Sequence, residues 1–258
     1  MDTHPKNIEN LKDLKKIGHI TPSSNTTLEP LTAMMTHPVS NLVSNHFTRI
    51  TVKKISLDTE DTGRFEVDNM VAAATLLADA DVDAILWNGT SGCWNGTGAD
   101  VEMCRAITGE IDIPASTSTL AQYEVFERYG IEKFALAVPY LDDVTQKAIE
   151  TYGEAGYEAV SYANLNKTVN TEFAAVPLDR IRQLLRDADS PEAECIAVVC
   201  TNFAAALVVE EMEQELGKPI FDSVAVTFWK ALEMVGIEPP IPGWGTLFEA
   251  ETVRSKLS

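Results

Sequence analysis

Cys200 is the residue of this chain whose type and position best suit acid–base chemistry. It ends the short apolar run at 196–199, and two hydrogen-bonding residues, Thr201-Asn202, follow it directly. A second apolar run, at 84–88, ends in the same way at Gly89-Thr90-Ser91. Buried parallel strands deliver polar groups to the carboxyl edge of a sheet, where open α/β folds bind ligands. We therefore predict two related strand ends at one site, of which only one carries a thiol.

These two strand ends belong to a longer internal repeat. Each is followed by a proline-containing segment, a helical stretch and the tripeptide Gly-Ile-Glu, at 130–132 in one half and at 236–238 in the other. The tripeptide begins 130 − 89 = 41 residues after Gly89 and 236 − 200 = 36 residues after Cys200. Such self-similarity indicates a diverged duplication. We expect Gly89 and Cys200 to face each other across a cleft between the halves.

The elements that must position these residues alternate along the chain. Apolar runs predict strands at 16–21, 46–55, 84–88, 134–138, 158–163 and 196–199. Apolar residues at spacings of three and four predict helices at 67–80, 98–107, 120–129, 144–154, 178–187 and 224–234. This order is typical of an α/β fold with parallel sheets and crossover helices. The segment 165–176 fits neither pattern and is predicted to be a loop or lid.

The chain length of 258 residues suits two lobes of ordinary domain size. We predict an N-terminal extension at 1–15, a first α/β lobe at 16–130 and a second at 131–224. The C-terminal segment 225–258 is expected to complete the first lobe.

Composition limits the partners of the protein. There are 39 acidic and 20 basic residues, giving a net charge of −19, which disfavours binding to nucleic acid or to an anionic membrane. The first ten residues lack an apolar signal core, and no run reaches the length of a membrane span. The four cysteines and four histidines show no spacing typical of metal ligands. We expect a cytoplasmic monomer or small homo-oligomer with reduced thiols and no metal.

Five short motifs, in order, resemble one enzyme group. They are Pro22–Thr27, Gly89-Thr90-Ser91, Pro139–Val144, Cys200-Thr201-Asn202 and Gly243–Phe248. Together they are similar to the maleate isomerase and arylmalonate decarboxylase branch of the aspartate/glutamate racemase superfamily, over nearly the whole chain after Lys15. The resemblance implies two pseudo-symmetric Rossmann-like lobes with parallel sheets, an active site in the cleft between them, and catalysis without a cofactor.

Gly89 is where this chain departs from most of that superfamily. The racemases and isomerases carry one cysteine in each lobe, and the resemblance places the second at Cys200 but matches the first to Gly89. Arylmalonate decarboxylases share this pattern of one glycine and one cysteine. The resemblance therefore implies a decarboxylase of α-substituted malonates, whose enediolate intermediate is protonated on one face by Cys200.

The supporting residues are assigned by type and position. An enediolate requires aligned donors, for which Gly89, Thr90, Ser91, Tyr140 and Thr201 are suited through hydroxyl or backbone N–H groups. The turn containing Pro22, Ser24 and Asn25 is a typical helix cap that could also present donors to a substrate carboxylate. Asn170 resembles an isomerase asparagine that contacts substrate, although a solvated loop residue fits the sequence nearly as well.

Alternative interpretations remain at this level. Cys93 could swing toward the cleft as a substitute second thiol, which would support isomerase or racemase chemistry on a small dicarboxylate or amino acid. A carboxylate-binding protein without turnover is a further alternative, because one fold hosts many functions. Cys104 and Cys195 are interpreted as packing residues. Trp87, Trp94 and Phe203 fit either a pocket lining or the core.

Overall fold

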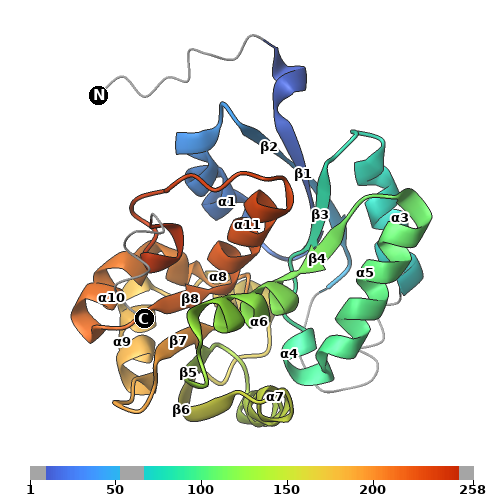
Figure 1. Cartoon of the computed structure of the whole chain (residues 1–258). Helices are drawn as coiled ribbons and strands as arrows, with labels where there is room; N and C mark the ends of the chain where they lie inside the picture. Colours follow the sequence, from blue (N-terminus) through green and yellow to red (C-terminus); the bar gives the residue numbers. More distant parts are fainter. Residues whose placement is uncertain (1–9, 53–66, 250–258) are drawn as a thin grey trace.

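The protein contains two four-stranded, wholly parallel sheets, as the computed structural model shows for residues 10–52 and 67–249 (Figure 1). The first sheet contains β1 (Lys15–Pro22), β2 (Val43–Ile50), β3 (Ala84–Trp87) and β4 (Ala115–Thr117). The second contains β5 (Lys133–Val138), β6 (Glu158–Asn164), β7 (Cys195–Val198) and β8 (Ile220–Asp222). Their strand orders, β2-β1-β3-β4 and β6-β5-β7-β8, are equivalent. The predicted α/β fold with two pseudo-symmetric lobes is confirmed.

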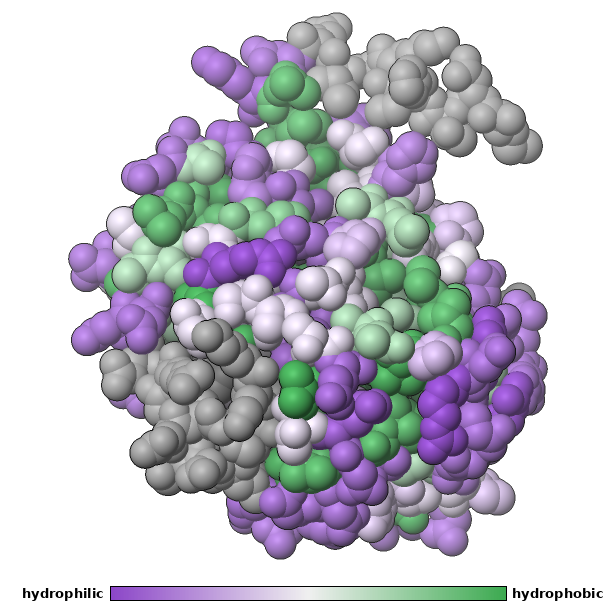
Figure 2. Space-filling view, turned by 180° about the vertical axis from the view of Figure 1, so that it is seen from behind, coloured by the Kyte–Doolittle hydropathy of each residue, from purple (hydrophilic) through white to green (hydrophobic). Residues whose placement is uncertain are grey.

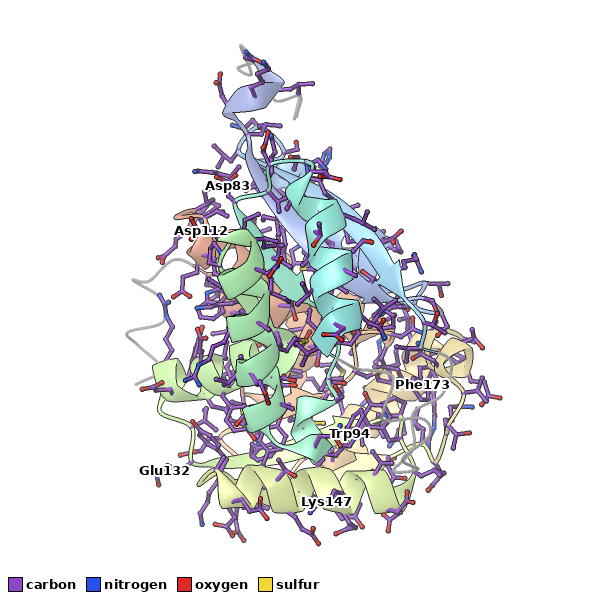
Figure 3. All side chains as sticks on the ribbon, turned by 90° about the vertical axis from the view of Figure 1, so that its right-hand side faces the viewer. Asp83, Trp94, Asp112, Glu132, Lys147 and Phe173 are labelled. Atoms are coloured by element: carbon purple, nitrogen blue, oxygen red, sulfur yellow. The ribbon has the colours of Figure 1, made fainter. Side chains whose placement is uncertain are left out.

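Helices cover both sheets, and their bounds are α1 (Leu28–Thr36), α3 (Val67–Ala78), α4 (Gly92–Asn95), α5 (Thr97–Ile111), α6 (Ser118–Tyr129), α7 (Asp142–Glu154), α8 (Asn170–Ala174), α9 (Leu178–Ala188), α10 (Val209–Leu216) and α11 (Ser223–Met234). In the first lobe, α3 packs on β1 and β2 and against α5. In the second lobe, α7 and α9 pack on β6. The short α4 rests on α7 of the other lobe, as Figure 3 shows for Trp94 above the helix that carries Lys147.

The two lobes exchange a helix. Helix α6 follows a strand of the first sheet, yet its Phe126 ring lies 5.1 Å from that of Phe134 and 6.4 Å from that of Phe221, both on the second sheet. Helix α11 follows a strand of the second sheet and packs against β3 and α1 of the first lobe. The two helices contact each other in the middle of the molecule (Figure 1), where Thr227 donates a hydrogen bond to Ser118 at 2.7 Å.

The duplication is visible in the hydrogen bonds that start these two helices. Thr117 caps α6 by accepting from the backbone N–H of Leu120 at 3.0 Å, and Asp222 caps α11 by accepting from the N–H groups of Val224 and Ala225. The next residue in each copy, Ser118 or Ser223, donates to a backbone carbonyl at the end of the neighbouring strand. Such side-chain caps satisfy orphan donors at a helix start.

Several elements differ from the sequence-based prediction. Strands β4 and β8 were not predicted, because three residues are too few for a periodic pattern, and α1, α4, α8 and α10 were also missed. The segment predicted as a loop or lid contains the short α8. The strand predicted at 46–55 begins earlier, at Val43, and its residues 53–55 lie outside the described residues.

The lobe boundaries in the chain stay predictions. Segments 1–9 and 250–258, assigned to the N-terminal extension and to the end of the C-terminal segment, lie outside the described residues. No helix within 10–52 and 67–249 has both the length and the apolar composition needed to cross a bilayer. On the face shown in Figure 2, hydrophilic side chains surround smaller hydrophobic areas.

Candidate active site

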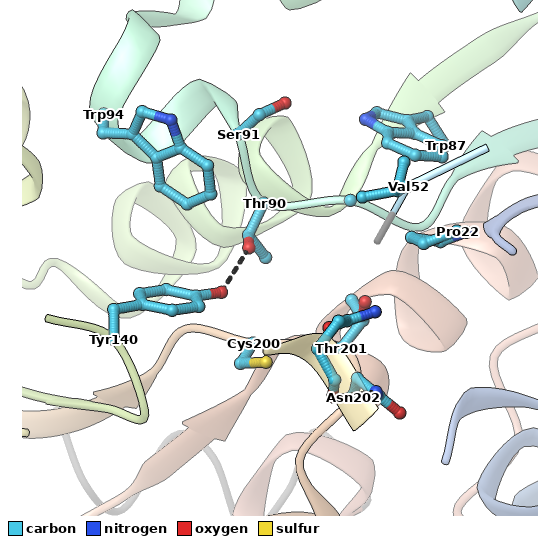
Figure 4. A pocket seen from close by; sticks show the side chains of 12 residues that line it. Pro22, Val52, Trp87, Thr90, Ser91, Trp94, Tyr140, Cys200, Thr201 and Asn202 are labelled. Carbon is cyan, nitrogen blue, oxygen red and sulfur yellow. Dashed lines mark hydrogen bonds between the residues drawn. The ribbon is translucent and has the colours of Figure 1, made fainter. Parts of the chain in front are cut away.

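A pocket lies where strand ends of both lobes meet (Figure 4). Its empty volume is about 340 Å³ when counted out to its opening to solvent. The described residues that line it are apolar or neutral and polar, with no charged side chain among them: Pro22, Val52, Trp87, Gly89, Thr90, Ser91, Trp94, Tyr140, Asn170, Cys200, Thr201 and Asn202.

Cys200 lies at the end of β7 and lines the pocket with only 3% of its surface exposed. Burial raises the pKa of its thiol to about 12, although hydrogen bonds from the Tyr140 hydroxyl and the Asn202 N–H act in the opposite direction. Burial has this effect because a low dielectric disfavours the thiolate. The thiol is therefore neutral at ordinary pH. It is suited to donate a proton, whereas the nucleophilic thiolate is scarcely populated.

Tyr140 joins the two lobes at this pocket. Its hydroxyl lies 2.9 Å from Oγ1 of Thr90, and burial raises its pKa well above the usual value. Trp94 and Phe173 pack edge-on against its ring, at centroid distances of 5.4 and 5.5 Å. These contacts restrict the ring, so the hydroxyl group is held between Thr90 and Cys200 (Figure 4).

Gly89 is the counterpart of Cys200 in the first lobe, and the space beside it is occupied. A Cβ atom built on Gly89 would lie 2.2 Å from Cζ2 and 2.3 Å from Cε2 of Trp87. The indole therefore stands where a side chain at position 89 would begin. Trp87 was one of three apolar candidates in the sequence, but nothing in the residue spacing indicates that its ring folds back over Gly89.

Two of the predicted site residues do not line the pocket. Asn25 is buried between the lobes, where its amide donates to the carbonyl and hydroxyl oxygens of Thr201 at 3.1 and 3.2 Å. Its side-chain oxygen accepts from the N–H groups of Thr27 and Leu28 at the start of α1. Ser24 donates to the carbonyl of Val52 and accepts from Asn170. In this arrangement the side chains of Asn25 and Ser24 form hydrogen bonds between separate parts of the chain and are not among the lining residues of the pocket.

The remaining predicted residues are brought together. Pro22, Gly89, Thr90, Ser91, Tyr140, Asn170, Cys200 and Thr201 all line the pocket. Asn202 also lines it and was not predicted, although its place in the repeat is that of Ser91. Its side chain accepts from the backbone N–H groups of Thr26 and Thr27 and donates to the carbonyl of Asn170, at 2.7 to 3.2 Å.

Cys93 is fully buried in the short helix α4 and is not a lining residue of the pocket. Burial and the nearby Asp100 raise the pKa of its thiol well above the usual value. Cys195 is fully buried within β7. Among the described residues, no group of three or more His, Cys, Asp or Glu side chains is arranged to hold a metal ion.

This arrangement provides one neutral acid, Cys200, and several hydroxyl and amide donors beside an apolar wall. Such a site can stabilise negative charge that develops on a bound carboxylate and can deliver a proton to one face of the adjoining carbon.

Comparison with known proteins shows which family the chain resembles. The family model described as arylmalonate decarboxylase matches residues 30–248. The maleate isomerase of Geobacillus stearothermophilus is 24% identical over 247 residues, covering 92% of this chain and 98% of that protein. The arylmalonate decarboxylase of Bordetella bronchiseptica is 24% identical over 187 residues, covering 71% of this chain and 78% of that protein.

The fold is also shared with solved structures. One is a cysteine-to-serine mutant of the Nocardia farcinica maleate cis-trans isomerase with a covalently bound succinylcysteine intermediate. It matches with a TM-score of 0.84 and 21% sequence identity, covering 92% of this chain and 98% of that chain. Since the family model spans most of the sequence, the chain belongs to the arylmalonate decarboxylase family.

Proposed function

We propose that the protein is a cofactor-independent decarboxylase of α-substituted malonate-type acids. One observation carries the proposal: Cys200 is the only thiol lining the pocket among the described residues, and its counterpart in the first lobe is Gly89, which is covered by the Trp87 indole. Inversion at carbon needs an acid and a base on opposite faces, whereas decarboxylation followed by protonation needs one acid.

The reaction would begin when the bond between the α-carbon and the departing carboxylate breaks. Carbon dioxide leaves, and the electron pair of that bond moves into the remaining carboxylate, which becomes an enediolate. The hydroxyl groups of Thr90 and Tyr140 and the N–H groups near Thr90 and Thr201 stabilise this charge. Cys200 then transfers its thiol proton to the α-carbon, and solvent returns a proton to the thiolate.

The apolar part of the pocket favours the bond-breaking step. Pro22, Val52 and Trp87 lie together on one side, and no lysine or arginine is present among the described lining residues. A carboxylate placed against this wall loses hydration without gaining a cationic partner, which raises its ground-state free energy relative to neutral carbon dioxide.

The second candidate is isomerisation or racemisation of a small dicarboxylate or amino acid. Two observations support it: Asn170 lines the pocket, and the relative from Geobacillus stearothermophilus is named a maleate isomerase. The structure with succinylcysteine indicates that a cysteine of the Nocardia farcinica enzyme forms a covalent bond to a succinyl group. This chemistry would require a second group on the Gly89 face.

The deciding experiment is carbon dioxide release and product mass from a panel of substituted malonates in deuterium oxide, with maleate in parallel and Cys200→Ala as the paired control. Cys200-dependent release, with one deuterium gained at the α-carbon, is the expected result. Fumarate formation, or deuterium exchange with racemisation and no carbon dioxide, would support the second candidate instead. Dicarboxylate-dependent thermal stabilisation without turnover would indicate a binding protein.

We further propose a cytoplasmic monomer or small homo-oligomer whose partner is a small carboxylate rather than nucleic acid or membrane. The net charge of −19 disfavours nucleic acid and anionic membranes as partners. Light scattering on the purified protein tests the oligomeric state.

A further inference from the structure

Trp87 borders two cavities. It lines the substrate pocket, and with Ser91 it also lines a neighbouring cavity, hereafter the Asp100 cavity, whose empty volume is about 310 Å³ when counted out to its opening to solvent. The other residues of this second cavity are Gly92, Asn95, Ala99, Asp100 and Met103. Trp87 and Ser91 belong to both linings, so these two residues lie between the two spaces.

The Trp87 indole can lie there because position 89 has no side chain. The indole atoms Cζ2, Cε2 and Nε1 lie within 2.6 Å of the place where a Cβ on Gly89 would be. Figure 4 shows the ring beside Val52 and Pro22, on the opposite side of Thr90 from Trp94. Trp87 is 2% exposed, so its ring is packed and not free to leave without rearrangement.

The polarity of the two spaces differs. None of the described residues that line the substrate pocket is charged, whereas the adjoining cavity contains the buried carboxyl of Asp100, which accepts a hydrogen bond from Thr117 at 2.6 Å. The indole therefore limits the room available to the substrate on the Gly89 side and separates its carboxylates from this acidic group.

From these contacts we infer that Trp87 is the residue that determines the size of the α-substituent, restricting the pocket to malonates with small alkyl groups and excluding aryl groups. This inference rests on the proposed decarboxylase function and names the substrate class for that site. The packed Trp87 indole excludes a larger α-substituent, because a side chain in a packed environment cannot be displaced without a cost in free energy. Removing the indole would join the two cavities and admit the larger substituent.

The test measures binding without turnover. In a Cys200→Ser protein, affinities for dimethylmalonate and for 2-methyl-2-phenylmalonate are determined by calorimetry, with and without Trp87→Ala. We expect the parent to prefer dimethylmalonate, and Trp87→Ala to shift the affinity ratio toward the phenyl compound by about tenfold or more, a change typical of reshaping an apolar pocket. Trp87→Phe, a smaller change that keeps an apolar ring, should shift the ratio in the same direction by less.

Met103→Ala is the matched control. It enlarges the Asp100 cavity without touching the substrate pocket, so the affinity ratio should stay that of the parent. An unchanged ratio in folded Trp87→Ala and Trp87→Phe proteins that still bind dimethylmalonate would overturn the inference while leaving the decarboxylase proposal intact. Failure of the parent to bind either malonate would instead overturn the proposed function, and the inference with it.

Discussion

The hydroxyl of Tyr140 and Oγ1 of Thr90, which come from different lobes, lie 2.9 Å apart, just past the carboxyl end of β3 and beside Cys200. Each lobe therefore contributes one hydroxyl to the same small volume. Because both groups are buried, a charge that develops there is stabilised more strongly than it would be in water.

Replacing Tyr140 with phenylalanine should lower kcat by about 10²- to 10³-fold, the usual loss when one donor of an oxyanion site is removed. The ring packing against Trp94 and Phe173 is retained, so the melting temperature should change little. Tyr152→Phe is the control, because Tyr152 is buried and its hydroxyl has no hydrogen-bond partner among the described residues. Equal kcat values for the two variants would remove Tyr140 from the mechanism.

Gly89→Cys would place a second thiol at the first-lobe counterpart of Cys200, but the new Cβ would overlap the Trp87 indole. We expect the single variant to lose about 1–3 kcal/mol of unfolding free energy through overpacking and to show little racemase activity.

Combining Gly89→Cys with Trp87→Ala should relieve this overlap. The double variant is expected to exchange deuterium at the α-carbon of a chiral monocarboxylic acid and to racemise it, because an acid and a base then stand on opposite faces. Chiral chromatography after incubation in deuterium oxide measures both effects. Efficient racemisation by the single variant would show that the indole moves aside without difficulty.

Asn25→Ala tests whether Asn25 connects the lobes or binds substrate. The substitution removes the donors to Thr201 and the acceptor for two N–H groups at the start of α1. We expect a loss of about 1–3 kcal/mol in unfolding free energy, typical of leaving buried polar groups without partners. The exposed Asn69→Ala on α3 is the control for denaturant titration. An unchanged stability together with a raised KM would restore the substrate-binding interpretation.

Asp222 should make stability dependent on pH. Burial raises its pKa to about 7, although the N–H groups of Val224 and Ala225 that Oδ1 accepts act in the opposite direction. Oδ2 has no hydrogen-bond partner among the described residues. The folded protein therefore keeps this proton at pH values where the unfolded chain, with a carboxyl pKa near 4, has released it. The stabilising contribution of the protonated Asp222 carboxyl to the unfolding free energy is fully present below about pH 4 and is lost as the pH rises through about 7.

Asp222→Asn keeps the capping oxygen and removes the titration. Relative to the parent, the unfolding free energy of this variant should therefore rise between pH 4 and pH 8, as measured by urea titrations at several pH values. The same titrations on Asp79→Asn, a substitution at an exposed position, provide the control. A difference between Asp222→Asn and the parent that does not change with pH would mean that the carboxyl of Asp222 is not buried in solution.

Sequence patterns predicted the parts of this structure that repeat and missed those that depend on packing. The strand ends at Gly89 and Cys200 could be paired because a duplication repeats residue types at similar spacing. The fold of the Trp87 ring over Gly89 could not be predicted, since a rotamer is chosen by neighbours distant in sequence. Asn25 suited both a cap and a substrate contact by type, and only its partners across the lobes distinguish them.

The exchange of α6 and α11 between the lobes bears on the origin of the duplication. Each sheet is covered by a helix that follows a strand of the other sheet, so a single repeat would expose the apolar surface that its partner's helix covers. A half-length repeat could therefore bury this surface only in a two-fold dimer with swapped helices, whereas two copies in one chain bury it and leave the two strand ends free to carry different residues, a thiol at Cys200 and none at Gly89.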